Sequence, residues 1–184
     1  MKSVLISIQP KWCERIANGS KTIEVRKTAP KIATPFKVYI YATKSGDRLV
    51  LKSDKVFEIS RAITGKVIGE FICDEITDAR DMGGDEFYQK SCLTYEDWRK
   101  YTDGTKNTIW LWYISDLVIY DKPRELSEFK RFCDGISGKI GCRGCKYYYE
   151  ENDESQGHFE MCGCDNMRPI TRPPQSWCYV ESEG

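Results

Sequence analysis

The sequence has a single histidine among its 184 residues, and it has no apolar run that approaches the length of a membrane span. A transmembrane helix needs roughly 18 or more apolar residues, so no such helix is predicted. The first apolar segment, residues 4–8, is also too short for the core of a signal peptide. We therefore expect a cytoplasmic protein with no membrane partner.

The chain also has no net charge, because 28 basic residues balance 28 acidic ones. Its distribution is uneven, since residues 1–48 carry ten basic and three acidic residues, a local net charge of +7. A basic region on a neutral protein indicates an anionic partner such as a phosphate backbone. A solvated basic surface would have the same composition, so charge alone leaves both interpretations open.

Cysteine, by contrast, is abundant: the chain has nine, and six of them lie in its last third. Without an export signal the compartment is expected to be reducing, which disfavours a disulfide framework. Cys142 and Cys145 have the spacing at which a tight turn lets two thiolates bind one metal ion, and Cys162 and Cys164 follow in the same polar segment. Four thiolates suit a structural Zn²⁺, and this segment has too few apolar residues to build a core of its own.

Hydrophobic periodicity predicts strands and helices mainly in the first two thirds of the chain. Strands are expected over residues 4–8, 21–26, 36–42, 66–73 and 109–120, and helices from Pro10 and from Thr94. Thr94 can cap its helix, with Asp97 answering from the third position. Residues 44–64 are predicted to form a hairpin or insertion, and residues 74–90 mostly loop. Asp116 is expected to mark a bulge or a break between two strands.

These elements predict an α+β, mostly β fold, namely a small mixed β-barrel with a few short helices. The composition changes at Pro123, after which apolar periodicity is weak and cysteines are frequent. We therefore predict an N-terminal domain over residues 1–121. Residues 122–184 are predicted to form a small, zinc-stabilised C-terminal extension.

The segment over residues 18–26 is the strongest candidate for a functional site. It is typical of a helix end, a tight turn and then a strand, on which Glu24 and Arg26 share one face because side chains alternate at period two. Lys21 lies at the start of that strand. A carboxylate and a guanidinium on one buried strand face are an unusual pair.

The pattern Gly19-x-Lys21-x-x-Glu24-x-Arg26 resembles the G-x-K-x-x-E-x-R signature of the ASCH domain family, within the PUA-like superfamily. The resemblance extends over about residues 3–121, and it includes the segments 7–10, 39–43 and 67–71 and the strand with Trp112 and Tyr113. The whole chain, including residues 172–180, is similar to a group of such proteins from bacteriophages, prophages and their hosts.

This resemblance implies a PUA-like β-barrel whose cleft holds the signature residues, in a superfamily associated with binding of RNA and modified nucleotides. Lys21 would contact a phosphate, Arg26 a phosphate or a base edge, and Glu24 an exocyclic amine. Trp12, Tyr41 and Trp112 would stack on a base. The alternative is that the charged residues form a structural ion pair and that the aromatic residues belong to the core.

The resemblance also raises the possibility of hydrolysis. One branch is similar to N4-acetylcytidine amidohydrolases, which use a lysine, a threonine and a glutamate. Lys21 matches the lysine, but Glu24 occupies the threonine position and Gln89 lies nearest to that of the glutamate, so this activity is not carried over. Other family members are linked to ribonuclease activity, for which this chain offers no pair of histidines. A hydrolase acting on a nucleoside or RNA through Lys21 and Glu24, or a phage–host module that binds another protein, remain alternatives.

The tail resembles sequences that keep a C…C-x-x-C…C arrangement, which favours one set of zinc ligands. That set is Cys133, Cys142, Cys145 and Cys164, with Cys162 as the alternative to one of them. Cys178 and His158 are further candidates.

Metal analysis of the purified protein tests this site. We expect about one equivalent of zinc per chain, because four thiolates bind Zn²⁺ tightly and the tail depends on the metal to fold. Less than about half an equivalent would contradict the prediction.

Overall fold

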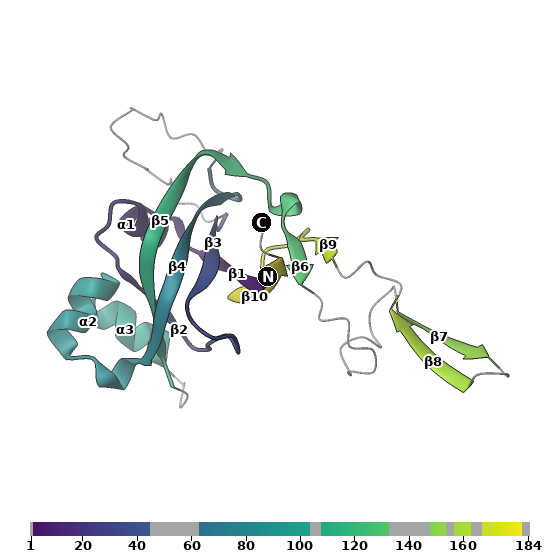
Figure 1. The fold of residues 1–184 in the computed structure, drawn as a ribbon. Helices are drawn as coiled ribbons and strands as arrows, with labels where there is room; N and C mark the ends of the chain where they lie inside the picture. The colour runs from purple at the N-terminus through teal and green to yellow at the C-terminus, as the bar shows by residue number, and fades with distance from the viewer. Residues whose placement is uncertain are drawn as a thin grey trace.

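The computed structural model describes residues 2–44, 63–103, 108–132, 148–153, 157–162 and 167–181. Its main body is an eight-stranded mixed sheet of order β2-β5-β4-β3-β1-β10-β6-β9 (Figure 1). β1 and β3 run parallel, and the other neighbouring strands are antiparallel. This arrangement confirms the coarser part of the predicted fold, namely an α+β class with a mixed sheet and a few short helices.

The elements of the main body follow one another along the chain. They are β1 (Lys2–Ile8), α1 (Pro10–Ala17), β2 (Ile23–Arg26), β3 (Phe36–Ala42), β4 (Val67–Asp78), η1 (Ala79–Asp81), α2 (Gly84–Ser91), α3 (Tyr95–Thr102), β5 (Trp110–Arg124), η2 (Leu126–Glu128), β6 (Lys130–Phe132), β9 (Met167–Pro169) and β10 (Trp177–Glu181). A second sheet pairs β7 (Tyr148–Asp153) with β8 (Gly157–Cys162).

The start of α3 has the predicted cap. The Thr94 hydroxyl accepts a hydrogen bond from the Asp97 backbone N–H, and the Asp97 carboxylate accepts one from the Thr94 N–H. Asp116 is the predicted bulge rather than a break. Its φ is +43°, and β5 passes through it with one extra residue relative to β4, since Ser115 lies opposite Ile72 and Val118 opposite Glu70.

The prediction that residues 74–90 are mostly loop is wrong. β4 continues to Asp78 because it pairs with β5 as far as Trp110. Ile76 is the one apolar residue in its last five positions, so the sequence gives little sign of a strand there. α2 forms because Phe87 is buried against Trp98 of α3, with ring centroids 4.8 Å apart. Acidic residues in its first turn also suit a helix N-terminus.

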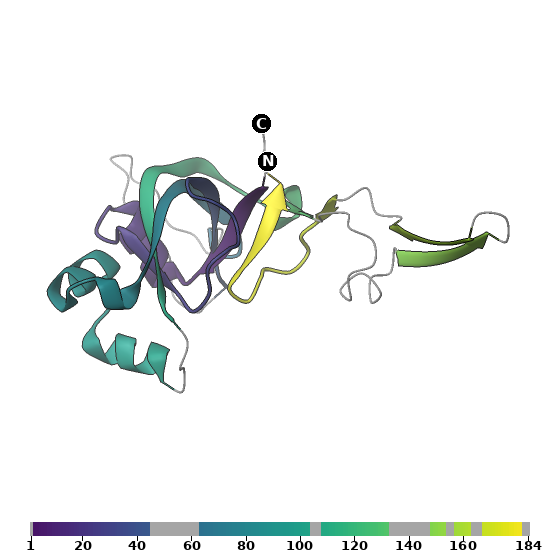
Figure 2. The same ribbon diagram turned by 60° about the horizontal axis from the view of Figure 1, so that its bottom comes forward.

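β10 lies in the middle of the main sheet, between β1 and β6. It pairs antiparallel with β1, and Figure 2 shows its yellow arrow beside the purple strand at the N-terminus. Strands from both sides of residue 121 therefore share one sheet. Most of the predicted hairpin or insertion at 44–64 lies outside the described residues, as do Cys133, Cys142, Cys145 and Cys164, which are four of the predicted zinc ligands.

The sheet is covered by apolar side chains on both faces near β1, whose residues Val4, Ile6 and Ile8 point into one cluster and Leu5 into another. A third cluster lies between β2, β5 and the two helices α2 and α3, which Figure 1 shows together beside β2. In the part of the chain that the structure describes, no helix is long and apolar enough to cross a membrane.

Candidate functional site

A tight turn between α1 and β2 positions the predicted site. Gly19 has a φ of +77°, a conformation that glycine adopts without the steric cost of a side chain, and its N–H donates to the carbonyl of Ile16. The Lys21 N–H then donates to the Arg15 carbonyl. β2 follows directly and pairs with β5, with Glu24 opposite Trp112.

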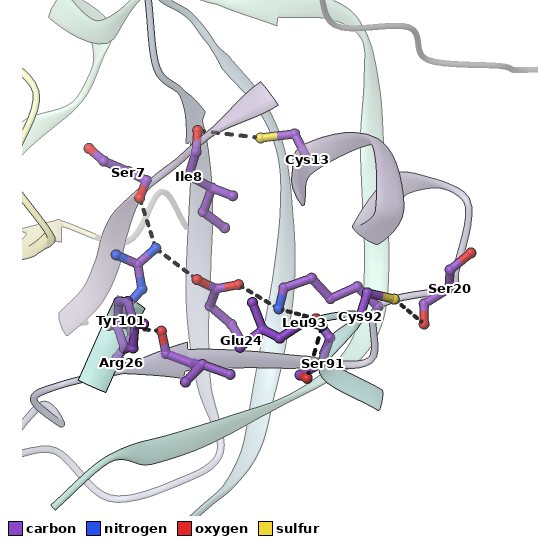
Figure 3. A network of polar contacts seen from close by, with 12 residues as sticks. Ser7, Ile8, Cys13, Ser20, Glu24, Arg26, Ser91, Cys92, Leu93 and Tyr101 are labelled. Carbon is purple, nitrogen blue, oxygen red and sulfur yellow. Dashed lines mark hydrogen bonds and ion pairs between the residues drawn. The ribbon is translucent and has the colours of Figure 1, made fainter. Parts of the chain in front are cut away.

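Lys21, Glu24 and Arg26 form a buried chain of charges. Oε1 of Glu24 lies 2.9 Å from an Arg26 guanidinium nitrogen, and its Oε2 lies 3.4 Å from Nζ of Lys21. Figure 3 shows Glu24 reaching toward Arg26. The three residues are only 3%, 6% and 9% exposed, respectively. The structure therefore brings together the charged residues that the signature predicted.

Each cation is also fixed by a group from a distant part of the chain. Lys21 Nζ donates to the carbonyl of Ser91 at the end of α2, at 2.8 Å. Arg26 donates to the carbonyl of Ser7 in β1 at 2.8 Å, and to the Ser176 hydroxyl just before β10 at 3.3 Å. These contacts fix the side chains, which is how a binding site is preorganised.

The charge chain is not neutral, because it contains two cations and one carboxylate, a net charge of +1. Within the described part of the chain, Oε2 of Glu24 and Nε of Arg26 have no hydrogen-bond partner, although Oε2 is within ion-pair range of Lys21. Buried polar atoms without partners cost free energy. A ligand that brings negative charge and hydrogen-bonding groups would therefore be favoured here.

A cavity of about 310 Å³ lies against this charge chain. That volume is at the lower end of the range for small-molecule sites. Trp12 of α1 and Tyr101 of α3 supply aromatic surface, and Lys21, Glu24 and Arg26 supply the charge. The remaining lining residues are Ser7, Ile8, Gln9, Val25, Thr43, Leu93 and Gln175.

Further lysines lie over both aromatic rings. Nζ of Lys11 is 4.3 Å from the Trp12 ring centroid, and Nζ of Lys27 is 5.1 Å from that of Tyr101. The Tyr101 hydroxyl donates to the Val25 carbonyl at 3.2 Å, and burial raises the pKa of Tyr101, so this group is neutral at pH 7. The site thus combines positive potential with flat apolar surfaces.

Trp12 lines the cavity, whereas Tyr41 and Trp112, the other two aromatic residues expected to stack on a base, do not. Tyr41 is 3% exposed and packs in the cluster with Leu5, Tyr39 and Val67 on the other face of the sheet. Trp112 is fully buried against Phe36 and Trp177 and belongs to the core.

Sequence reasoning missed Tyr101, Gln175 and the anchoring groups of Ser91 and Ser176. Tyr101 lies on the helix that Thr94 caps, but no local pattern indicates that its ring reaches β2. Among the described residues, no group of three or more metal-binding side chains comes together. The zinc site stays a prediction, because four of its predicted ligands lie outside those residues and nothing is described of the Cys162 side chain.

The fold and the site define an α+β domain in which a strand–turn motif places a Lys–Glu–Arg chain against a cavity. A family model of the ASCH domain matches residues 6–181, past the boundary predicted at residue 121. The chain therefore belongs to the ASCH domain family, as its signature indicated.

Solved structures of the same family share this fold. The chain is similar to an ASCH protein from Zymomonas mobilis at 22% identity and a TM-score of 0.50, covering 67% of this chain and 73% of that one. A mutant of the Zymomonas mobilis protein matches at 17% identity with a TM-score of 0.56, covering 97% and 88%. No curated protein matches the chain.

The Glu24→Gln substitution tests the charge chain. It removes the one carboxylate between two buried cations, so we expect a loss of about 3–5 kcal/mol in the free energy of unfolding, measured by chemical denaturation.

Glu96→Gln is the matched control, because Glu96 pairs with Lys100 on the exposed face of α3. We expect its unfolding free energy to stay close to that of the wild type, since exposed ion pairs contribute little. Equal effects of the two substitutions would show that Glu24 does not hold the site together.

Proposed function

We propose that this protein binds RNA or a modified nucleotide in the cavity lined by Lys21, Glu24 and Arg26. The observation that carries the proposal is the buried net positive charge beside Trp12 and Tyr101. Membership in the ASCH family, with its PUA-like fold, supports a nucleic-acid-binding role in general.

Each part of the cavity has a role in this proposal. The rings of Trp12 and Tyr101 offer stacking surfaces, which bind bases of any sequence. Arg26 and Lys21 attract the phosphate, for which a guanidinium is well shaped. The Oε2 atom of Glu24 accepts from an amine of the base and thereby gains the hydrogen bond that it lacks.

The proposal is binding rather than hydrolysis. Glu24 lies between two cations and Lys21 is held by Ser91, so both groups are engaged in positioning one another. The hydrolase alternative predicts that the wild-type protein turns over a substrate and that Lys21→Ala abolishes this turnover. The binding proposal predicts no turnover by the wild-type protein.

The C-terminal part of the proposal is a structural zinc ion bound by Cys133, Cys142, Cys145 and Cys164, with Cys162 as the alternative ligand. Its support is the Cys-x-x-Cys spacing and the polar composition of that segment. The alternative role of this segment is to bind another protein, which pull-down with and without a zinc chelator tests.

Binding of fluorescently labelled single-stranded RNA, measured by anisotropy, tests the proposed function. We expect binding at low salt that weakens at least about tenfold between about 50 and 200 mM salt, because phosphate contacts release counterions. Trp12→Ala should cost about 1–3 kcal/mol of binding free energy through lost stacking.

Tyr95→Ala is the control, because Tyr95 is 66% exposed at the start of α3 and does not line the cavity. Its affinity should match that of the wild type. Failure to bind RNA at low salt, or an equal loss in both variants, would overturn the proposal. The same RNA, recovered intact after incubation with the protein, would exclude hydrolysis of its phosphodiester bonds.

A further inference from the structure

A second cavity lies beside residues 171–176, which belong to the connection between β9 and β10. Its volume is about 410 Å³. Arg131 of β6 and Arg172 supply its charge, and Thr171 and Cys178 supply polar groups. Pro169, Ile170, Pro173 and Pro174 complete its lining.

Both arginines are available to a ligand. Their side chains are exposed, and neither forms an ion pair with any residue that the structure describes. Burial raises the pKa of the Cys178 thiol, although Arg131 opposes this shift, so the thiol is neutral at pH 7 and adds no negative charge. The cavity therefore carries a charge of +2 from its lining residues.

Residues 171–176 contribute lining residues to both cavities. Pro174 lines the second cavity and Gln175 lines the first, so consecutive residues face the two sites. Ile170 and Cys178 belong to the apolar cluster on the opposite face of the sheet from Trp12, so a strand that reaches both cavities passes around this segment.

This segment is held in place at its C-terminal end. The Ser7 hydroxyl donates to the Pro174 carbonyl at 2.7 Å, and the Ser7 N–H donates to the Ser176 carbonyl at 2.9 Å. Arg26 donates to the Ser176 hydroxyl. Arg26 therefore links the charge chain directly to residues 171–176.

We propose that the cavity with Arg131 and Arg172 is a second subsite, which binds a backbone phosphate of the same RNA strand whose nucleotide occupies the first cavity. Guanidinium groups bind phosphate through parallel hydrogen bonds, and the Thr171 hydroxyl adds another donor. The inference rests on the proposed function, and it adds that the ligand is an oligonucleotide rather than a free nucleotide.

Affinity as a function of ligand length tests the subsite. The probes are a mononucleotide, a single-stranded RNA of about twelve nucleotides and inorganic phosphate, each titrated against the full chain. We expect the oligonucleotide to bind more tightly than the mononucleotide. In the double variant Arg131→Gln and Arg172→Gln, oligonucleotide affinity should fall at least about tenfold, and the slope of log affinity against log salt should become shallower by about 0.7, the value for one phosphate contact on a single strand.

Two further measurements make the result specific. The double variant should bind the mononucleotide as the wild type does, which also shows that it is folded. Arg80→Gln is the control, because Arg80 is exposed, pairs with Asp78 and lines neither cavity. Its oligonucleotide affinity should stay within about twofold of the wild type, since an exposed ion pair contributes little.

The outcomes separate the two proposals. If the mononucleotide and the oligonucleotide bind equally well, or if the double variant keeps its oligonucleotide affinity, the subsite is wrong while the first cavity stands. An equal loss in Arg80→Gln, or inorganic phosphate binding at the arginines as tightly as the oligonucleotide, also overturns the subsite. Absence of binding by every RNA probe overturns both proposals.

Discussion

The site depends on one physical constraint, which is the burial of two cations with a single carboxylate between them. Buried charges are tolerated only when they are paired and hydrogen-bonded. Glu24 pairs with both Lys21 and Arg26, and other donors of the two cations are directed to Ser91, Ser7 and Ser176. The charge chain therefore connects β2 to β1, to the end of α2 and to the segment before β10. The excess positive charge that remains is what makes the cavity attractive to an anion.

The local parts of this arrangement could be predicted from the sequence. Glu24 and Arg26 share a strand face because side chains alternate, and Gly19 supplies the turn that brings Lys21 to the same place. The Thr94 cap and the Asp116 bulge could also be predicted, since each depends on residues close in sequence or on a break in a regular pattern. The ASCH signature then connected these local features to a fold.

The parts that depend on distant contacts could not be predicted. Alternation along β3 assigns Tyr41 to one face of the strand. Which face borders the cavity depends on the whole sheet, and Tyr41 lies on the other one. Tyr101 and Gln175 reach the cavity from elements far from β2 in sequence. α2 was missed because its acidic, glycine-containing sequence shows only Phe87 as a strong apolar anchor, and that residue is buried by packing against Trp98. In each case tertiary packing, rather than propensity, determines the outcome.

Ultraviolet cross-linking of bound single-stranded RNA, followed by mass spectrometry of the cross-linked peptides, tests the central claim most directly. If the charge chain is the floor of a nucleotide site, the nucleotide should be attached at Trp12 or Tyr101, the two aromatic residues that line the cavity. Cross-links that omit both residues, and that occur instead at exposed positions such as Tyr95, would contradict the account.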